Sequence, residues 1–247
     1  MRPSPWALEH IVWDWNGTLL DDSWLCLEIL NELLTTQGLP TVTPEHYREI
    51  FDFPVRDYYE RAGFDLAATP FEELAAYFVT EYERRRFECS LRSGAPEVLG
   101  ELQAAGLGQS LLSAYRHDYL VSAVASWGIG EHFLRLAGQG DAWADGKEGL
   151  GRRHVATLGL TPERVAFVGD TTHDAQVAAA VGARCILVDG GTQARHRLQA
   201  TAAVREKTSG KMALMPHSAR RSTSRAQSAR EVGRVLRSIH TPRRPGL

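Results

Sequence analysis

Short runs of consecutive apolar residues alternate along the chain with longer segments whose apolar residues recur every three or four positions. The runs are about five residues long and end at polar or turn-forming residues, which is typical of buried strands. They cover 10–14, 109–113, 164–168 and 184–188. Strands that alternate with helices of about 10–12 residues predict βαβ units and a parallel sheet. The pattern therefore predicts an α/β fold with a doubly wound parallel sheet.

A block without any convincing strand follows the first run. Asp22 and Ser23 are good N-caps for an amphipathic helix over about 23–37. A proline starts each of the next helical stretches, where the first N–H needs no helical partner. These stretches cover about 44–51, 55–62 and 70–88. We therefore expect an all-helical cap domain at 21–90, inserted into a core formed by 1–20 and 91–204.

Charge is divided unevenly between the body of the chain and its C-terminal end. Residues 205–247 hold 11 Lys and Arg and 2 acidic residues, a net +9, whereas residues 1–204 hold 17 basic and 28 acidic residues, a net −11. The end has few large apolar residues, so we expect 205–247 to be a disordered basic tail, with no strand after 203. A basic tail can attract nucleic acid, but the pattern favours a solvated extension.

Composition argues against a disordered chain, a disulfide-stapled chain and a membrane-spanning chain. The hydrophobic fraction is 43%, which is ordinary for a soluble protein with a real core. The three cysteines are far apart, which indicates a reducing compartment and argues against structural zinc. No apolar run approaches the roughly 20 residues that span a bilayer, and the N-terminus lacks a secretory signal. We expect a cytoplasmic protein with no membrane contact; its oligomeric state stays open.

Polar residues follow the predicted strands at the edge where parallel sheets bind ligands. Asp14 and Ser113 end the first and second runs, and Asp170 follows the third. Lys147 begins the helix between the second and third runs. Two carboxylates suit a divalent cation such as Mg²⁺, and a lysine with a hydroxyl suits a phosphate. Gly17 lets the backbone approach a ligand closely, and its turn can offer N–H groups to an anion.

Four segments resemble the motifs of the haloacid dehalogenase-like hydrolase superfamily. The segment DWNGTLLD, 14–21, resembles the nucleophile motif DxDGTLxD, and GDTTHD, 169–174, resembles the fourth motif, GDxxxD. Ser113 and Lys147 are similar to the second and third motifs. The helical block between the first two motifs resembles the cap of the phosphoglycolate phosphatase-like branch. The resemblance implies a Rossmann-like core, Mg²⁺ and a small phosphorylated metabolite as substrate.

The resemblance also implies roles for individual residues. Asp14 would be the nucleophile and would form an aspartyl-phosphate. Mg²⁺ would be held by Asp14, the backbone carbonyl of Asn16 and Asp170, while Asp174 would support metal-bound water or hold Lys147. The groups that would bind the phosphoryl oxygens are Gly17, Thr18, Ser113, Ala114 and Lys147.

The first motif departs from the family at Asn16, where the usual aspartate protonates the leaving oxygen and then activates water. An amide can do neither, and general acid–base catalysis is worth typically ~10²–10⁴-fold. The departure implies slow hydrolysis, substrates with good leaving groups such as acyl phosphates, or a substitute acid such as His117 or His173.

We therefore expect Mg²⁺-dependent hydrolysis of a small-molecule phosphate monoester through an aspartyl-phosphate at Asp14. Two rival functions stay open because of Asn16: a phosphotransferase or phosphomutase of the same fold, and a catalytically weak phosphate-binding or regulatory protein. The phosphate-binding cation also stays open, since Arg116, Arg152 or Arg153 could replace Lys147.

Overall fold

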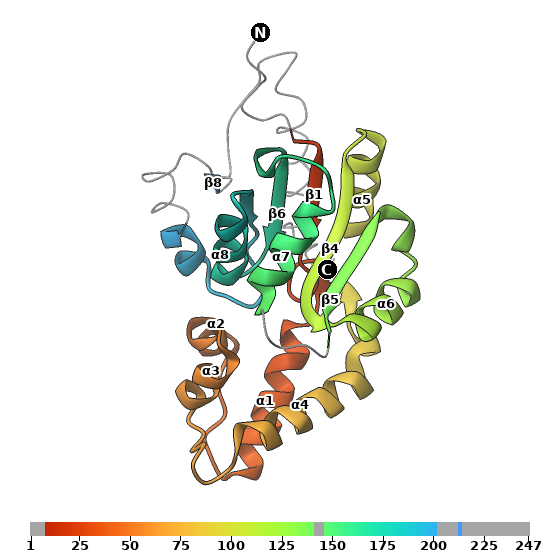
Figure 1. The fold of residues 1–247 in the computed structure, drawn as a ribbon. Helices are drawn as coiled ribbons and strands as arrows, with labels where there is room; N and C mark the ends of the chain where they lie inside the picture. The colour runs from red at the N-terminus through yellow and green to blue at the C-terminus, as the bar shows by residue number, and fades with distance from the viewer. Residues whose placement is uncertain (1–7, 141–145, 202–211, 214–247) are drawn as a thin grey trace, which may run out of the picture.

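The computed structural model describes residues 8–140, 146–201 and 212–213 of the 247-residue chain. Its central feature is a parallel sheet with the strand order β5-β4-β1-β6-β7-β8 (Figure 1). The strands are β1 (His10–Trp13), β4 (Gly108–Arg116), β5 (Arg135–Gln139), β6 (Val165–Gly169), β7 (Arg184–Leu187) and β8 (Met212–Ala213). The predicted α/β class with a parallel sheet is confirmed. Because β1 pairs with both β4 and β6, the residues that follow these strands meet at one edge.

Both faces of the sheet are covered, which explains the continuous apolar runs. Ile11 and Trp13 belong to one buried cluster and Val12 to the other, as the period of two requires. Helices α5 (Ala95–Ala104) and α6 (His117–Ser126) supply the first cluster, and α7 (Gly146–Ala156) and α8 (Thr172–Val181) supply the second. Figure 1 shows the two helix pairs on opposite sides of the sheet. The short 3₁₀ helices η2 (Gly130–His132) and η4 (Pro162–Arg164) lie in connecting loops.

The helical insertion lies between β1 and β4 and forms the lower part of Figure 1. Its helices are α1 (Ser23–Thr36), α2 (Pro44–Ile50), α3 (Val55–Ala62) and α4 (Phe71–Arg85), followed by the 3₁₀ helix η1 (Arg86–Glu88). The insertion has an apolar cluster of its own, centred on residues such as Leu34, Tyr58 and Leu74. The predicted single helix over 70–88 is thus an α-helix with a 3₁₀ end.

Two short strands were not expected from the sequence. Strand β2 (Leu20–Asp21) pairs antiparallel with β3 (Ser90–Leu91), where the chain enters and leaves the insertion. The expectation of no strand after 203 is also wrong, because β8 pairs parallel with β7. Two-residue strands carry no readable periodicity, so only their pairing partners define them. The rest of the tail predicted at 205–247 lies outside the described residues.

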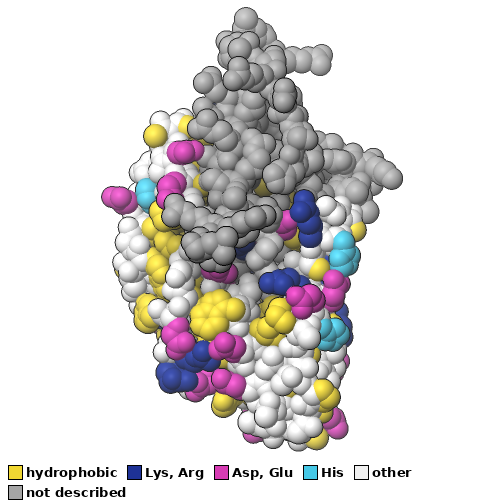
Figure 2. All heavy atoms as spheres, turned by 180° about the vertical axis from the view of Figure 1, so that it is seen from behind, with side chains coloured by type: hydrophobic (Ala, Val, Ile, Leu, Met, Phe, Trp, Pro, Cys, Tyr) yellow, Lys and Arg dark blue, Asp and Glu magenta, His cyan; other side chains and the backbone are white. Residues whose placement is uncertain are grey.

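One face of the molecule carries side chains of both charges (Figure 2). Basic and acidic side chains are interspersed over the described part of the face in Figure 2. Within the described residues, no helix combines the length and the apolar character needed to cross a bilayer.

Candidate active site

Three carboxylates and one ammonium meet beyond the carboxyl ends of β1 and β6. Asp14 follows β1, Asp170 follows β6, Asp174 lies in the first turn of α8, and Lys147 lies in the first turn of α7. One oxygen from each of the three carboxylates lies within 4.8 Å of the others. The Lys147 Nζ atom lies 2.5 Å from Asp14 Oδ1 and 2.6 Å from Asp174 Oδ1. The structure thus brings together four of the residues singled out in the sequence.

Glycines allow the backbone to wrap closely around Asp170. A Cβ at Gly17, whose φ is +69°, would lie 2.3 Å from Asp170 Oδ2, and a Cβ at Gly191 would lie equally close. The Thr192 N–H donates to Asp170 Oδ2 at 2.6 Å, and the Thr18 hydroxyl donates to Oδ1 at 3.1 Å. Asp170 is therefore fixed in position, with no space beside it for an additional side chain at 17 or 191.

Asp174 is bonded both to Thr171 at the start of α8 and to Lys147 in the carboxylate cluster. Its Oδ2 accepts hydrogen bonds from the backbone N–H and the hydroxyl of Thr171. The first of these, with the bond from the Asp174 N–H to the Thr171 hydroxyl oxygen, forms a capping box at the start of α8. Its Oδ1 accepts from Lys147. Of the two roles that the resemblance implied for Asp174, the structure shows contact with Lys147.

The cluster is buried and unbalanced in charge. Burial, together with the charges of Asp174 and Asp170, raises the pKa of Asp14 to about 8 in spite of Lys147. Burial and the charge of Asp174 raise the pKa of Asp170 to about 6. Burial acts to raise the pKa of Asp174 as well, but the charge and hydrogen bonds of Lys147 bring it below the ordinary value. Three carboxylates facing one ammonium favour a further cation.

Asn16 belongs to a separate, adjoining network. Its amide Nδ2 donates to Asp22 Oδ2 at 2.6 Å and to the Tyr82 hydroxyl at 2.7 Å. The Tyr82 hydroxyl donates to the same Asp22 oxygen at 2.7 Å. The Gly17 N–H, one of the groups expected to bind phosphate, donates to Asp22 Oδ1 at 2.8 Å. Asp22 and Tyr82 thus fix the turn after β1, Asp22 through the Asn16 amide and the Gly17 N–H, and Tyr82 through the Asn16 amide.

Sequence analysis alone does not identify Asp22 and Tyr82 as parts of this site. Asp22 was expected to cap the first helix of the insertion, and it does occupy the N-cap position of α1. Its side chain makes no capping bond, however, because both oxygens accept from the network around Asn16. Tyr82 is 66 positions from Asn16, so no local pattern connects them. The visible signal is an extra carboxylate, Asp22, close to the place where the motif lacks one.

Ser113 and Ala114 make no hydrogen bond to the carboxylates among the described contacts. The Ser113 hydroxyl is buried and accepts a hydrogen bond from the Tyr115 N–H, at the bulge near the end of β4. Ala114, next to it, is half-buried. Among the described contacts, neither residue is bonded to Asp14. Their assignment to phosphate binding stays a prediction.

The substitute acids and bases named from the sequence have other partners. His117 Nδ1 pairs with the Gly138 N–H, and the His173 ring lies against Phe53, with the ring centroids 4.7 Å apart. Arg116 is bonded to the exposed carboxylate of Asp118. Lys147 is accordingly the cation that the structure places on Asp14.

The insertion contacts the core close to Asp170. Arg197 donates to Asp52 Oδ2 at 2.7 Å and to the backbone carbonyl of Phe51. Gln193 also donates to the Phe51 carbonyl, at 3.1 Å. Since Gln193 follows Thr192, which is bonded to Asp170, the loop that fixes Asp170 also docks the insertion.

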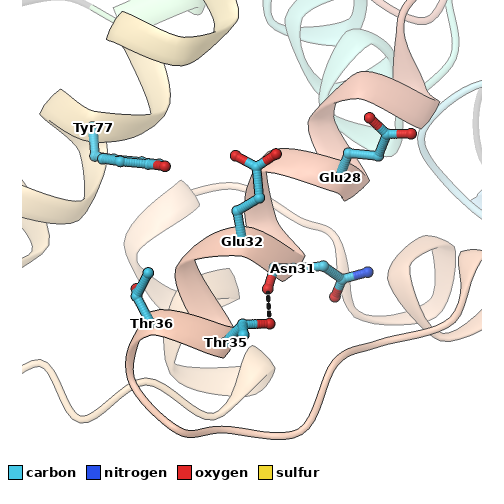
Figure 3. A pocket seen from close by; sticks show the side chains of 6 residues that line it. All are labelled: Glu28, Asn31, Glu32, Thr35, Thr36 and Tyr77. Atoms are coloured by element: carbon cyan, nitrogen blue, oxygen red, sulfur yellow. Dashed lines mark hydrogen bonds between the residues drawn. The ribbon is translucent and has the colours of Figure 1, made fainter.

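A cavity elsewhere in the molecule does not suit a phosphate. It measures about 530 Å³ and is lined by Glu28, Asn31, Glu32, Thr35, Thr36 and Tyr77 (Figure 3). In Figure 3 the Tyr77 side chain reaches from α4 towards α1, which carries both glutamates. Carboxylates in the lining repel an anionic ligand, so the carboxylate–lysine cluster remains the candidate active site.

Comparison with known proteins agrees with this geometry. The family model described as haloacid dehalogenase-like hydrolase matches residues 11–188. The tyrosine-protein kinase PtkA of Mycobacterium tuberculosis is 26% identical over 186 residues, which cover 73% of this chain and 62% of that protein. The phosphoglycolate phosphatase of Chromobacterium violaceum is 27% identical over 192 residues, covering 74% and 86%.

A solved structure supports the fold. A haloacid dehalogenase-like family hydrolase from Streptococcus pneumoniae superposes with a TM-score of 0.69 at 18% identity, covering 79% of this chain and 91% of that one. The match to the family model extends from β1 to the end of β7 and includes the whole carboxylate–lysine cluster. The chain belongs to the haloacid dehalogenase-like hydrolase family.

Proposed function

We propose that the protein is a Mg²⁺-dependent phosphatase that hydrolyses the phosphate monoester of a small molecule through an aspartyl-phosphate at Asp14. The observation that carries the proposal is the position of Asp14 at the end of β1, bonded to Lys147 and within 4.8 Å of Asp170 and Asp174. The phosphoglycolate phosphatases among its relatives support this reaction class.

The residues present fit a divalent cation. Their donors are hard carboxylate oxygens, the type that Mg²⁺ prefers. Burial, and after it the charges of neighbouring carboxylates, raises the pKa values of Asp14 and Asp170, so a cation beside them would favour their ionised forms. We propose that Asp14, Asp170 and the backbone carbonyl of Asn16 hold the ion. Asp174 would position Lys147 through its hydrogen bond to the ammonium. When bound, Mg²⁺ neutralises charge on the transferring phosphoryl group and orients it.

Each nearby residue then has a task. Asp14 Oδ1 is held by Lys147, whereas Oδ2 has only a long contact of 3.5 Å with the Thr18 hydroxyl, so Oδ2 is the oxygen placed to attack phosphorus. Lys147 has three N–H donors and uses two on carboxylates, which leaves one for a phosphoryl oxygen. We assign Ser113, Ala114 and Thr18 to the remaining phosphoryl contacts; the Gly17 N–H, also expected there from the sequence, is already donated to Asp22 Oδ1.

The insertion supports a small substrate. We propose that residues 21–90 act as a cap over a core of 1–20 and 91–204, docked through Arg197 and Gln193. A docked cap excludes water and bulky molecules from the carboxylates. Cap side chains would then determine which metabolite enters.

A second function is favoured by two observations. Asn16 has no acid group to complete hydrolysis, and PtkA, a relative over 73% of the chain, is named a kinase. Both favour transfer of the phosphoryl group from Asp14 to an acceptor other than water. A third function that the same residues allow is phosphate binding with little turnover.

Steady-state turnover separates these functions. Wild type and Asp14→Asn are assayed with Mg²⁺ on a panel containing phosphoglycolate, N-acetylmuramic acid 6-phosphate and an aryl phosphate. We expect turnover of at least one compound by wild type and its loss in Asp14→Asn. Arg116→Ala, which removes an exposed ion pair, is the matched control and keeps the wild-type rate. Equal turnover by wild type and Asp14→Asn overturns the proposal.

A further inference from the structure

The amide of Asn16 is locked by the network around it. Both of its N–H hydrogens are used, one on Asp22 Oδ2 and one on the Tyr82 oxygen. The Tyr82 hydrogen is itself donated to Asp22. Asp22 and Tyr82 are 1% and 5% exposed, so water does not compete for these bonds. Every hydrogen in the network therefore already has an acceptor inside it.

This arrangement fixes the orientation of the side chain at position 16. The amide nitrogen faces Asp22 and Tyr82, so the amide oxygen Oδ1 lies on the opposite side of the group. Among the described residues, no donor is bonded to that oxygen. Position 16 thus offers its surroundings an acceptor only, since a carbonyl oxygen has no proton to give.

Neither partner can supply the missing proton without breaking the network. To carry a proton to the leaving group, the Asp22 carboxyl would have to give up the two hydrogen bonds that its Oδ2 accepts. The Tyr82 hydroxyl would have to break its hydrogen bond to Asp22. The two histidines considered as substitute acids make other contacts, His117 with the Gly138 N–H and His173 with the Phe53 ring, and neither is bonded to Asn16 among the described contacts. Within the described residues, no group bonded to Asn16 is therefore free to protonate a leaving group at the turn after β1.

We propose that Asp22 and Tyr82 are positioning residues that hold Asn16 as an acceptor, and that the protein therefore takes phosphoryl groups from donors whose leaving oxygen needs no proton. This inference rests on the aspartyl-phosphate at Asp14 in the proposed function; it specifies aryl phosphates among the monoesters and adds acyl phosphates and phosphoanhydrides as donors. The bond from Asp14 Oδ2 to phosphorus forms while the bond to the leaving oxygen breaks. The leaving group departs with the electron pair as a carboxylate, phenolate or phosphate anion, and no proton moves.

The same network predicts a long-lived phosphorylated form. Hydrolysis of the aspartyl-phosphate needs water to lose a proton as it attacks, and the Asn16 oxygen can orient that water but takes its proton poorly. Dephosphorylation is then slower than phosphorylation, which leaves time for another acceptor to take the phosphoryl group.

The test uses aryl phosphates of graded leaving-group acidity: 2,4-dinitrophenyl, 4-nitrophenyl and phenyl phosphate, each with Mg²⁺ and wild-type protein. We expect a burst of phenolate followed by slow turnover, and a steep fall in the burst rate from the first compound to the last. A flat dependence without a burst overturns the inference, because another group then protonates the leaving oxygen. Failure of every compound to release phenolate overturns the proposed function instead.

Two variants test the pair directly. In Asn16→Asp/Asp22→Asn the donor and acceptor change places, so the network is kept while a carboxyl group stands at 16. We expect this variant to raise the rate with phenyl phosphate relative to dinitrophenyl phosphate by ~10²–10⁴-fold, the value of a general acid. Asp22→Asn alone places two amides face to face and should lose the burst for all three compounds, and the second change should restore it. The same leaving-group dependence in wild type and the exchange variant contradicts the assignment.

Discussion

The Lys147 ammonium lies 2.5 Å from Oδ1 of Asp14, although 133 positions separate the two residues in the chain. The contact exists because β1 and the first turn of α7 meet at the same edge of the sheet. It leaves Oδ2 of Asp14 as the less restrained oxygen and gives a buried carboxylate its nearest opposite charge. The geometry therefore suits the proposed roles of Asp14 as nucleophile and Lys147 as phosphate-binding cation.

Replacement of Lys147 by Met should destabilise the protein strongly. Asp14 and Asp174 would then be buried without their cation, and breaking a buried pair from one side costs about 3–5 kcal/mol. The free energy of unfolding in urea at pH 7, without metal, measures the loss. We expect a larger loss at pH 9, above the pKa of about 8 of Asp14, because its carboxyl is then ionised and buried without a cation.

Arg116→Ala is the matched control for this prediction. Its ion pair with Asp118 is exposed, and such pairs contribute about 0–1 kcal/mol. Equally small losses for Lys147→Met and Arg116→Ala would mean that the cluster is not held together by Lys147.

Magnesium should stabilise the folded protein through the same carboxylates. A ligand that binds only the folded state stabilises it by about 2.7 kcal/mol at a hundredfold excess over its Kd. Thermal unfolding with and without Mg²⁺, at constant ionic strength, measures the effect. Asp170→Asn should abolish the rise in Tm, whereas Asp118→Asn, at an exposed carboxylate, should keep it. An unchanged rise in Asp170→Asn argues against a metal at this site.

Gly17→Ala should damage the site far more than an equivalent change elsewhere. Gly17 and Gly38 have nearly the same φ, +69° and +68°, but a Cβ at 17 meets Asp170 Oδ2 at 2.3 Å and a Cβ at 38 meets nothing. Both variants bear the left-handed strain of about 1–2 kcal/mol. Only Gly17→Ala should also lose the Mg²⁺-dependent rise in Tm, measured as above. Identical behaviour of the two variants would show that the close approach to Asp170 has no consequence.

Two buried histidines should make stability depend on pH. His10 Nε2 and His154 Nε2 each lie 2.7 Å from the Ser110 hydroxyl, and burial lowers the pKa of both rings to about 4. In the unfolded chain they bind protons below about pH 6.5, so the unfolded state takes up more protons between pH 6.5 and 4. Stability is therefore complete above pH 6.5 and falls as the pH drops towards 4.

His154→Gln tests this dependence, because an amide can keep the bond to Ser110 without titrating. We expect the free energy of unfolding of this variant to change less between pH 7 and pH 5 than that of wild type. His132→Gln, at an exposed ring bonded to Gln103, should keep the wild-type slope. A wild-type slope in both variants would assign the pH dependence to other groups.

The sequence was sufficient for four of the six strands of the sheet and for the place of the carboxylates at its edge, because both depend on local patterns. An apolar run such as 10–14 predicts a buried strand, and parallel strands place the residues after them at one edge. The helices of the insertion follow from proline positions and helical periodicity, and α3 (Val55–Ala62) has the predicted bounds.

The missed features depend on long-range contacts. Asp22 looks like a helix cap because that is what an acid before a helix usually does, and only the fold brings Tyr82 against it. Strands β2 and β8 are two residues long, so pairing alone defines them. Lys147 could not be chosen over the nearby arginines until its distance to Asp14 was known.

The central claim, that Asp14 becomes phosphorylated, is tested most directly by trapping the intermediate. Wild type and Asp14→Asn are mixed with Mg²⁺ and 2,4-dinitrophenyl phosphate and quenched in acid, and their peptides are examined by mass spectrometry. The account predicts one added phosphoryl group on the peptide that contains Asp14 in wild type and none in Asp14→Asn. A phosphoryl group on another residue, or release of phenolate with Asp14 unmodified and dispensable, would contradict it.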